Sequence, residues 1–377
     1  MIDLRFGVAT DLHIALPHTV PPTTNRFHRT EYSVAAFEAA LATLSSLNLD
    51  LLLLCGDLTQ DGEVDNHRWL AQRLGQLPYP VYVIPGNHDI VTPAGTAQTI
   101  SAADFRRCYA AHGYADTDQL YYSQLVAPGV RLIGLNSIFF EGDTQTYRGR
   151  LDAAQLEWLT QTLEESGDEL VIVMVHHNVL EHLPGQSQSR LGQRYMLENA
   201  PALLEILSRH GVQLVFTGHL HVQDVAHFSG TRPIYDIATG STVSYPHPFR
   251  VLHYREAEAG AGELRIETHR VQRIPGVEDL QQQSREFMGD RSYPFIKRLL
   301  TDDPLSLDEA AATALLPALR YLWADIAHGD AQFKFPQFTP TVRQYFERFS
   351  CRSAIDNQAI LQITRPTKRP TATLPLR

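Results

Sequence analysis

The chain has 377 residues, of which 44% are hydrophobic and 20% are charged, the balance of an ordinary soluble globular protein. This length exceeds one typical domain, so we expect one large domain with an additional module. No apolar run approaches the roughly 18 residues that a membrane-spanning helix needs. The net charge of −10 would repel a polyanion, which argues against DNA or RNA as a partner.

The cysteines and the first residues indicate the compartment. Cys55, Cys108 and Cys351 are the three cysteines, an odd and sparse set that cannot form a disulfide framework. Residues 1–6 lack the basic segment and the long apolar segment of an export signal. We therefore expect a cytoplasmic protein that does not associate with membranes.

Five short apolar runs, each followed directly by polar residues, predict buried strands. They lie at 5–10, 51–54, 81–84, 170–175 and 212–216. Runs of four to six residues rich in Val, Ile and Leu are typical of strands buried on both faces. Helical patterns occur between or before them at 32–47, 64–77, 152–165 and 201–210. This alternation predicts an α/β sheet, whose ligands bind beyond the carboxyl ends of the strands.

The remaining patterns predict a second sheet and a helical module. Shorter strands, expected to form a second sheet packed on the first, lie at 120–126, 130–136, 225–228, 233–237, 250–254 and 264–271. Helical spacing follows at 277–287 and at 307–328, the latter with a capping box of Ser306 and Glu309, a kink at Pro317 and an end at Gly329. A further helix begins at Pro340. We expect one domain over 1–274, a helical module over 275–363 and a disordered tail over 364–377.

The polar residues after the five main runs are of the types that bind divalent metals. They are Asp11, His13, Asp57, Asn87, His88, Asp89, His176, His177, His219 and His221. Imidazole and carboxylate ligands suit first-row metals at hydrolytic sites. Two ions roughly 3.5–4 Å apart assist the hydrolysis of phosphate esters, and such a pair needs a shared carboxylate. Asp57, on the tight turn that Gly56 allows, is the natural bridge.

In this order, the motifs Asp-x-His, Gly-Asp, Gly-Asn-His-Asp, His and Gly-His-x-His resemble the calcineurin-like metallophosphoesterase superfamily. Within it the chain is most similar to the branch of cyclic-nucleotide phosphodiesterases and glycerophosphodiesterases, and the resemblance covers about residues 5–270. It implies a four-layer α-β-β-α sandwich. It also implies two divalent metal ions per chain, Mn²⁺, Fe²⁺ or Zn²⁺.

The resemblance also assigns roles to single residues. The family's ligands of the first metal correspond to Asp11, His13 and His221. Its ligands of the second metal correspond to Asn87, His176 and His219, and the ligand that both metals share corresponds to Asp57. His88 matches a histidine that binds no metal but contacts the phosphate and assists the leaving group. After His176 and His177 the nearer relatives usually have proline, whereas this chain has Asn178.

Four further residues are expected near the centre without binding metal. Asp89 would fix the tautomer of His88, as carboxylates do for working histidines. His177 would support the ligands. His18 and His28 lie in the 16–29 loop, which follows the first motif and would overhang the site to select the substrate.

These residues predict a hydrolase of small phosphodiesters, in which a hydroxide between the two metals attacks phosphorus. The expected partner is a small phosphorylated substrate, and the helical module would lid the site or pair two subunits in a homodimer. Three alternatives use the same residues: a small-molecule phosphomonoesterase, a nuclease, and a metal-stabilised scaffold without activity. The charge of −10 disfavours the nuclease.

Overall fold

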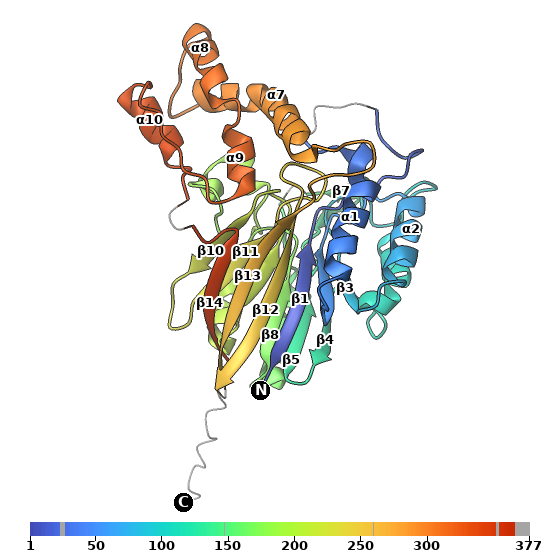
Figure 1. Ribbon diagram of the computed structural model, residues 1–377. Coiled ribbons are helices and arrows are strands. Elements are labelled where there is room, and N and C mark those ends of the chain that lie inside the picture. The colour runs from blue at the N-terminus through green and yellow to red at the C-terminus, as the bar shows by residue number, and fades with distance from the viewer. Residues whose placement is uncertain (23–26, 147, 259, 352–353, 366–377) are drawn as a thin grey trace, which may run out of the picture.

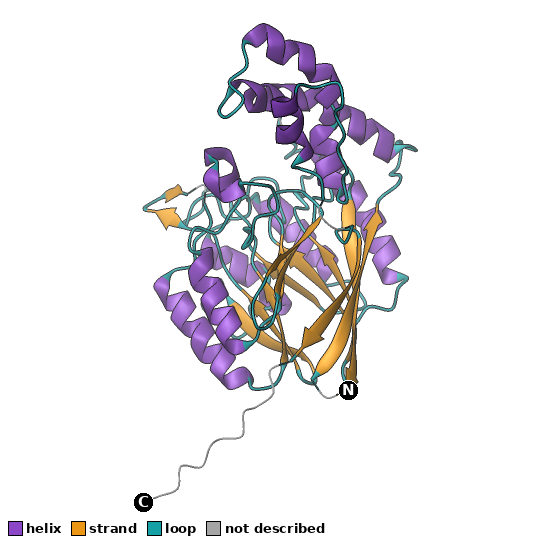
Figure 2. Ribbon diagram, turned by 90° about the vertical axis from the view of Figure 1, so that its left-hand side faces the viewer, coloured by secondary structure: helices purple, strands orange, loops and turns teal. Residues whose placement is uncertain are grey.

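The computed structural model describes residues 1–22, 27–146, 148–258, 260–351 and 354–365, arranged as two six-stranded sheets with helices on their outer faces (Figure 1). Figure 2 shows the strands between helical layers, with a separate group of helices above them. Phe6 in one sheet packs edge-to-face on Phe216 in the other, with ring centroids 5.7 Å apart. The predicted four-layer α-β-β-α sandwich is confirmed.

The first sheet has the strand order β14-β13-β12-β1-β2-β3. Its strands are β1 (Asp3–Ala9), β2 (Leu51–Cys55), β3 (Val81–Ile84), β12 (Pro248–Glu258), β13 (Ala261–Arg270) and β14 (Gln358–Thr364). β1, β2 and β3 are parallel, whereas β12, β13 and β14 continue the sheet antiparallel. All five residues of β2 are buried, as the continuous apolar run predicts.

The second sheet has the order β10-β11-β9-β8-β5-β4. Its strands are β4 (Tyr122–Ala127), β5 (Val130–Gly134), β8 (Leu170–Met174), β9 (Leu214–Thr217), β10 (Asp224–Phe228) and β11 (Ile234–Ala238). A small hairpin of β6 (Phe140–Glu141) and β7 (Thr144–Gln145) stands apart. The neighbours β5, β8, β9 and β11 are parallel to one another.

Helices cover the outer faces. α1 (Ser33–Ser45) and α2 (Val64–Leu74) pack on the first sheet, while α4 (Ala153–Ser166) and α6 (Ala200–His210) pack on the second. The short helices α3 (Ala102–Cys108) and α5 (Arg190–Gln193) lie in connecting segments. Within the described residues, no helix has the length and apolar content that crossing a bilayer requires.

The predicted division of strands between the sheets was wrong. The five strands that precede the polar motifs do not share one sheet, because β8 and β9 belong to the second sheet. In their place β12 and β13 extend the first, β12 pairing with β1 from Asp3 opposite Arg255 to Val8 opposite Arg250. Local pattern predicts that a strand exists, whereas its pairing depends on contacts distant in sequence. The carboxyl ends of both parallel sets still meet at one edge of the sandwich.

The C-terminal helical module consists of α7 (Leu280–Thr301), α8 (Glu309–Leu319), α9 (Leu322–His328) and α10 (Pro340–Glu347). It sits over the edge of the sandwich at which β1 ends (Figures 1 and 2). The expected single helix over 307–328 is two helices, divided at Arg320 and Tyr321. The predicted capping box was also wrong: Asp308 caps α8 by accepting from the amide of Ala311.

The last described residues return to the first sheet. β14 pairs antiparallel with β13, from Ala261 opposite Thr364 to Glu267 opposite Gln358. Its alternating pattern of exposed and buried residues is that of an edge strand with one face on the core. The end of the expected helical module is therefore a strand of the main sandwich. Of the expected disordered tail, residues 366–377 lie outside the described part of the chain.

Candidate metal centre

Four side chains that follow three strands form a first group. The donor atoms of Asp11, His13, Asp57 and His221 lie within 4.8 Å of one another. His221 Nε2 is 3.1 Å from Asp11 Oδ1 and 3.4 Å from His13 Nε2. Asp11, His13 and Asp57 are almost completely buried. The loops after β1, β2 and β9 therefore bring two carboxylates and two imidazoles to one point.

A second group shares Asp57 with the first. The donor atoms of Asp57, His176 and His219 again lie within 4.8 Å of one another. His176 Nε2 is 3.2 Å from Asp57 Oδ2 and 3.2 Å from Asn87 Oδ1. Its Nδ1 faces the carbonyl of Cys55 over 2.9 Å, which leaves Nε2 for the centre. All seven predicted ligand residues are thus brought together, with Asp57 common to both groups.

The spacing of these atoms fits divalent metal ions. Ligands about 2.1 Å from one ion, at tetrahedral or octahedral angles, are about 3.0 to 3.4 Å apart. The separations of 3.1 Å for His221 and Asp11, 3.2 Å for His176 and Asp57, and 3.4 Å for His13 and His221 have this size. Buried carboxylates and imidazoles so close together are the donors that first-row divalent ions take.

Five ligand residues adopt a left-handed backbone conformation. The φ angles are 51° for Asp11, 42° for His13, 49° for Asp57, 66° for His219 and 59° for His221. Positive φ is uncommon outside glycine and costs of order 1–3 kcal/mol per residue, so it persists where the surrounding structure imposes it. Here it reverses the chain after β1, β2 and β9 and turns these five side chains toward the centre.

The glycines of the motifs are required by close packing. A Cβ atom at Gly86 would come within 3.0 Å of Asp57 Oδ1, and one at Gly218 would come within 3.0 Å of Asp11 Oδ2. Gly56, in the Gly-Asp motif, is equally crowded and also has a φ of +92°. Any side chain at these positions would displace a ligand.

His88 stands beside the first group without belonging to it. Its ring lies edge-on to that of His13, with centroids 4.8 Å apart. Its Nδ1 is 2.6 Å from the carbonyl of Gln60 and 3.3 Å from Asp61 Oδ1, so Nε2 is the atom left for a substrate. Burial opposes protonation, but the carboxylates of Asp57 and Asp61 raise the pKa of His88 to about 9.

The expected role of Asp89 was wrong. Its carboxylate accepts from the backbone amides of Leu58 (3.1 Å), Thr59 (2.9 Å) and Gly86 (2.8 Å), so it does not orient the His88 ring. The backbone turn after Gly86 directs the two neighbouring side chains apart. Asp89 instead ties the turn after Asp57 to the third motif, and Asp61 and Gln60 take the place beside His88.

The charges within the centre depend on one another. Burial alone would raise the pKa of Asp57, but His176, His88 and His13 hold it well below its usual range. Burial would lower the pKa of His176, but Asp57 raises it to about 9. Asp57 therefore carries its negative charge at neutral pH, as a shared metal ligand must.

The three remaining predicted histidines occupy different places. His177 is buried, bonds Ser137 Oγ over 2.8 Å and lies with its ring centroid 4.3 Å from that of His219. His28 stacks on His13, with centroids 4.5 Å apart and planes at 10°. His18 is not brought to the centre: it is exposed and pairs with Asp65 Oδ2 over 3.2 Å.

Two neighbours of the ligands had no signal in the sequence. The carbonyl of Arg194 accepts from His219 Nε2 over 3.2 Å, which leaves Nδ1 of His219 for the centre. Gln145 donates from Nε2 to the carbonyl of Asn87 over 2.7 Å and so fixes the Asn87 turn. Neither residue belongs to a motif, because both act through contacts between loops far apart in sequence.

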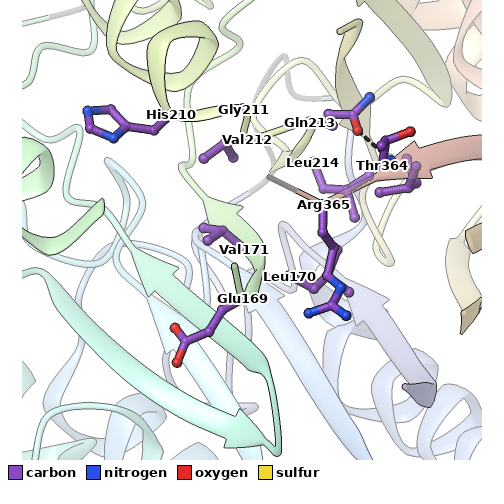
Figure 3. Close-up of a pocket in the computed structure, with 11 residues that line it drawn as sticks. Glu169, Leu170, Val171, His210, Gly211, Val212, Gln213, Leu214, Thr364 and Arg365 are labelled. Atoms are coloured by element: carbon purple, nitrogen blue, oxygen red, sulfur yellow. Dashed lines mark hydrogen bonds between the residues drawn. The ribbon is translucent and has the colours of Figure 1, made fainter. Parts of the chain in front are cut away.

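A narrow pocket lies away from these residues, at the amino ends of β8 and β9 (Figure 3). Leu170, Leu214 and Arg365 contribute to its walls, and Gln213 bonds the backbone amide of Thr364 over 2.7 Å. Its free space of about 10 Å³ is the size of a single water. The pocket lies between β14 and the second sheet and is too small to bind a substrate.

Known proteins are similar to this chain in sequence. Residues 4–223 match the family model described as calcineurin-like phosphoesterase. A probable cyclic nucleotide phosphodiesterase from Synechococcus is 29% identical over 219 residues, which are 58% of this chain and 73% of that protein. A 3',5'-cyclic-nucleotide phosphodiesterase from Nostoc is 27% identical over 189 residues, which are 49% of this chain and 62% of that protein.

A solved structure has the same fold. The dimetal phosphatase from Danio rerio superposes with a TM-score of 0.52 at 17% identity, covering 74% of this chain and 98% of that one. At this identity the likeness concerns the fold alone. Because the family model covers more than half of the sequence and includes all five motifs, the chain belongs to the calcineurin-like phosphoesterase family of metal-dependent hydrolases.

Proposed function

We propose that the protein hydrolyses small phosphodiesters, of the cyclic-nucleotide or glycerophosphodiester type, at a centre of two divalent metal ions. The observation that carries the proposal is the position of Asp57, whose carboxylate belongs to both ligand groups while His88 stands beside them. The names of the Synechococcus and Nostoc relatives support a diester as the substrate.

The predicted ligands would bind the two ions in two sets that share Asp57. Asp11, His13 and His221 would hold one ion, Asn87, His176 and His219 the other, and Asp57 both. When bound, the two ions supply an activated water and neutralise the phosphoryl oxygens. Mn²⁺, Fe²⁺ and Zn²⁺ all suit this mixture of imidazole, carboxylate and amide ligands.

His88 supplies the proton. Its Nδ1 proton is donated to the carbonyl of Gln60, so the imidazolium form presents its second proton at Nε2. Burial opposes this protonated form, but the Asp61 carboxylate and the Gln60 carbonyl, neither of which is a predicted metal ligand, raise the pKa of His88 and so favour it. From Nε2 the proton passes to the departing alkoxide as the ester bond breaks.

Hydrolysis of a chromogenic diester tests the proposal. Protein freed of metal by a chelator should not cleave bis(p-nitrophenyl) phosphate, and adding Mn²⁺, Fe²⁺, Co²⁺ or Zn²⁺ should restore cleavage. The monoester p-nitrophenyl phosphate, assayed in parallel, distinguishes a phosphomonoesterase. Cleavage of the diester in the presence of the chelator would refute the metal mechanism, and two bound ions without turnover of any ester would favour an inactive scaffold.

A further inference from the structure

His28 lies against the first ligand group, on the side away from the carboxylates. Its donor atom is within 4.8 Å of those of His13 and His221, but Asp11 and Asp57 do not belong to that set. Its ring is nearly parallel to that of His13 and has its centroid 5.8 Å from that of His221. The lone pair of an imidazole nitrogen lies in the plane of its ring. Two stacked, parallel rings therefore cannot both direct a lone pair at the same ion. His28 therefore lies beside the first ligand group, stacked on one of its members.

The residues on either side of His28 are anchored on the C-terminal helical module. Phe27 packs on the apolar cluster of the module, with its ring centroid 6.4 Å from that of Trp323 in α9. The guanidinium of Arg29 lies 4.0 Å from the ring centroid of Tyr32 and 5.1 Å from that of Phe287 in α7. Both chain neighbours of His28 thus contact the module, Phe27 at α9 and Arg29 at α7.

The same module packs on the loop that carries a metal ligand. Leu220 and Val222, which flank His221, are almost completely buried in the apolar cluster of the module. The backbone amide of Gln223 donates to the carbonyl of Ala327 in α9 over 3.2 Å. The module above the sheet edge in Figure 1 therefore contacts both His221 and His28 through their chain neighbours.

We propose that His28 is a substrate-binding residue that donates a hydrogen bond to a phosphoryl oxygen of the diester at the first ion, and that the helical module holds it there. The proposal rests on the proposed function, because it places the phosphoryl group at this centre. It gives the module a role in substrate binding within one chain.

The test compares His28→Ala with His18→Ala in the full-length, metal-loaded protein. His18 is a matched control, because it lies in the same 16–29 loop but is exposed and pairs with Asp65. His28→Ala should retain two ions per chain and weaken inorganic phosphate binding, measured by calorimetry, by about 10- to 100-fold, the loss of a hydrogen bond to a charged group. The KM for bis(p-nitrophenyl) phosphate should rise by a similar factor with a smaller change in kcat, and His18→Ala should change neither.

The role of the module is tested with Phe27→Leu, which keeps an apolar side chain but loosens the contact with Trp323. This variant should weaken phosphate binding less than His28→Ala does, and adding it to His28→Ala should cause no further loss, because both act through the same contact. Additive losses would overturn the role of the module. Unchanged phosphate affinity in His28→Ala, or the loss of one ion per chain, would overturn the role of His28. Phosphate binding is measured without turnover, so absence of diesterase activity in the wild-type protein would refute only the proposed function.

Discussion

The carboxylate of Asp57 accepts a hydrogen bond from the backbone amide of His88 over 2.8 Å. Its other oxygen lies 3.2 Å from Nε2 of His176, on the side of the second ligand group. One side chain therefore fixes both the metal ligands and the segment that carries the proposed acid. Because Asp57 is a shared ligand and His88 is not a ligand, changing Asp57 and changing His88 should have different effects.

Asp57→Ala should remove metal binding and activity together, because both groups lose their shared carboxylate. His88→Ala should retain both ions and slow turnover by about 10²–10⁴-fold, the usual contribution of a general acid or base. Metal content by elemental analysis and kcat on bis(p-nitrophenyl) phosphate check the two expectations. If His88→Ala loses its ions as Asp57→Ala does, His88 is a ligand and not the acid.

Gly86→Ala should disrupt the centre through a single methyl group. The added carbon would overlap Asp57, which must then shift, and a displacement of about 1 Å at a reacting centre lowers turnover by about 10²-fold. Gly75→Ala is the control, because its Cβ would meet only ordinary contacts of 3.6 Å. Equal activities of the two variants would show that Asp57 does not need its present position.

Removal of metal should destabilise the protein. An ion present at 100 times its dissociation constant stabilises the folded state by about 2.7 kcal/mol, and that amount is lost on chelation. The thermal midpoint should fall with a chelator and recover with Mn²⁺, whereas the midpoint of Asp57→Ala should respond little. A wild-type midpoint that is the same with and without chelator would contradict strong metal binding.

His182 should make stability depend on pH. It is buried between two carboxylates, 2.7 Å from Asp224 and 3.2 Å from Asp236. Burial opposes its charge, but these carboxylates raise the pKa of His182 to about 10. Since the pKa is raised on folding, the stabilisation is complete below the unfolded pKa of about 6.5 and is lost as pH rises through 10.

His182→Gln should therefore lower the free energy of unfolding by about 3–5 kcal/mol at neutral pH, as the loss of one partner of a buried ion pair does. The difference from wild type should shrink between pH 7 and pH 10 in urea titrations. His227→Gln, at an exposed position of β10, is the control and should show no such trend. A difference independent of pH would mean that His182 is neutral in the folded protein.

The sequence predicted local features of the centre better than contacts between its loops. The runs before Asp11, Asp57 and His176 are apolar on both faces, so strands and their polar ends were predictable from local pattern. The predicted role of Asp89 was wrong because the direction of its side chain depends on the backbone turn after Gly86. The residue types in the motif do not specify that turn.

The other differences between prediction and structure arise from contacts between residues far apart in sequence. Nothing in the local pattern of β8 and β9 indicates that they pair with β5 and β11 rather than with the strands of the first sheet. The alternation in β14 is that of a strand, but β14 follows the helical patterns of the module along the chain, and nothing local indicates that it returns to the first sheet. The contact of Phe27 with the module joins residues about 300 positions apart, beyond the reach of any sequence spacing.

Anomalous diffraction from crystals loaded with Mn²⁺ tests the metal centre most directly. Two peaks roughly 3.5–4 Å apart, one on each side of the Asp57 carboxylate, are expected from the two overlapping ligand groups. A single peak, or two peaks that do not share Asp57, would contradict a centre built on that side chain.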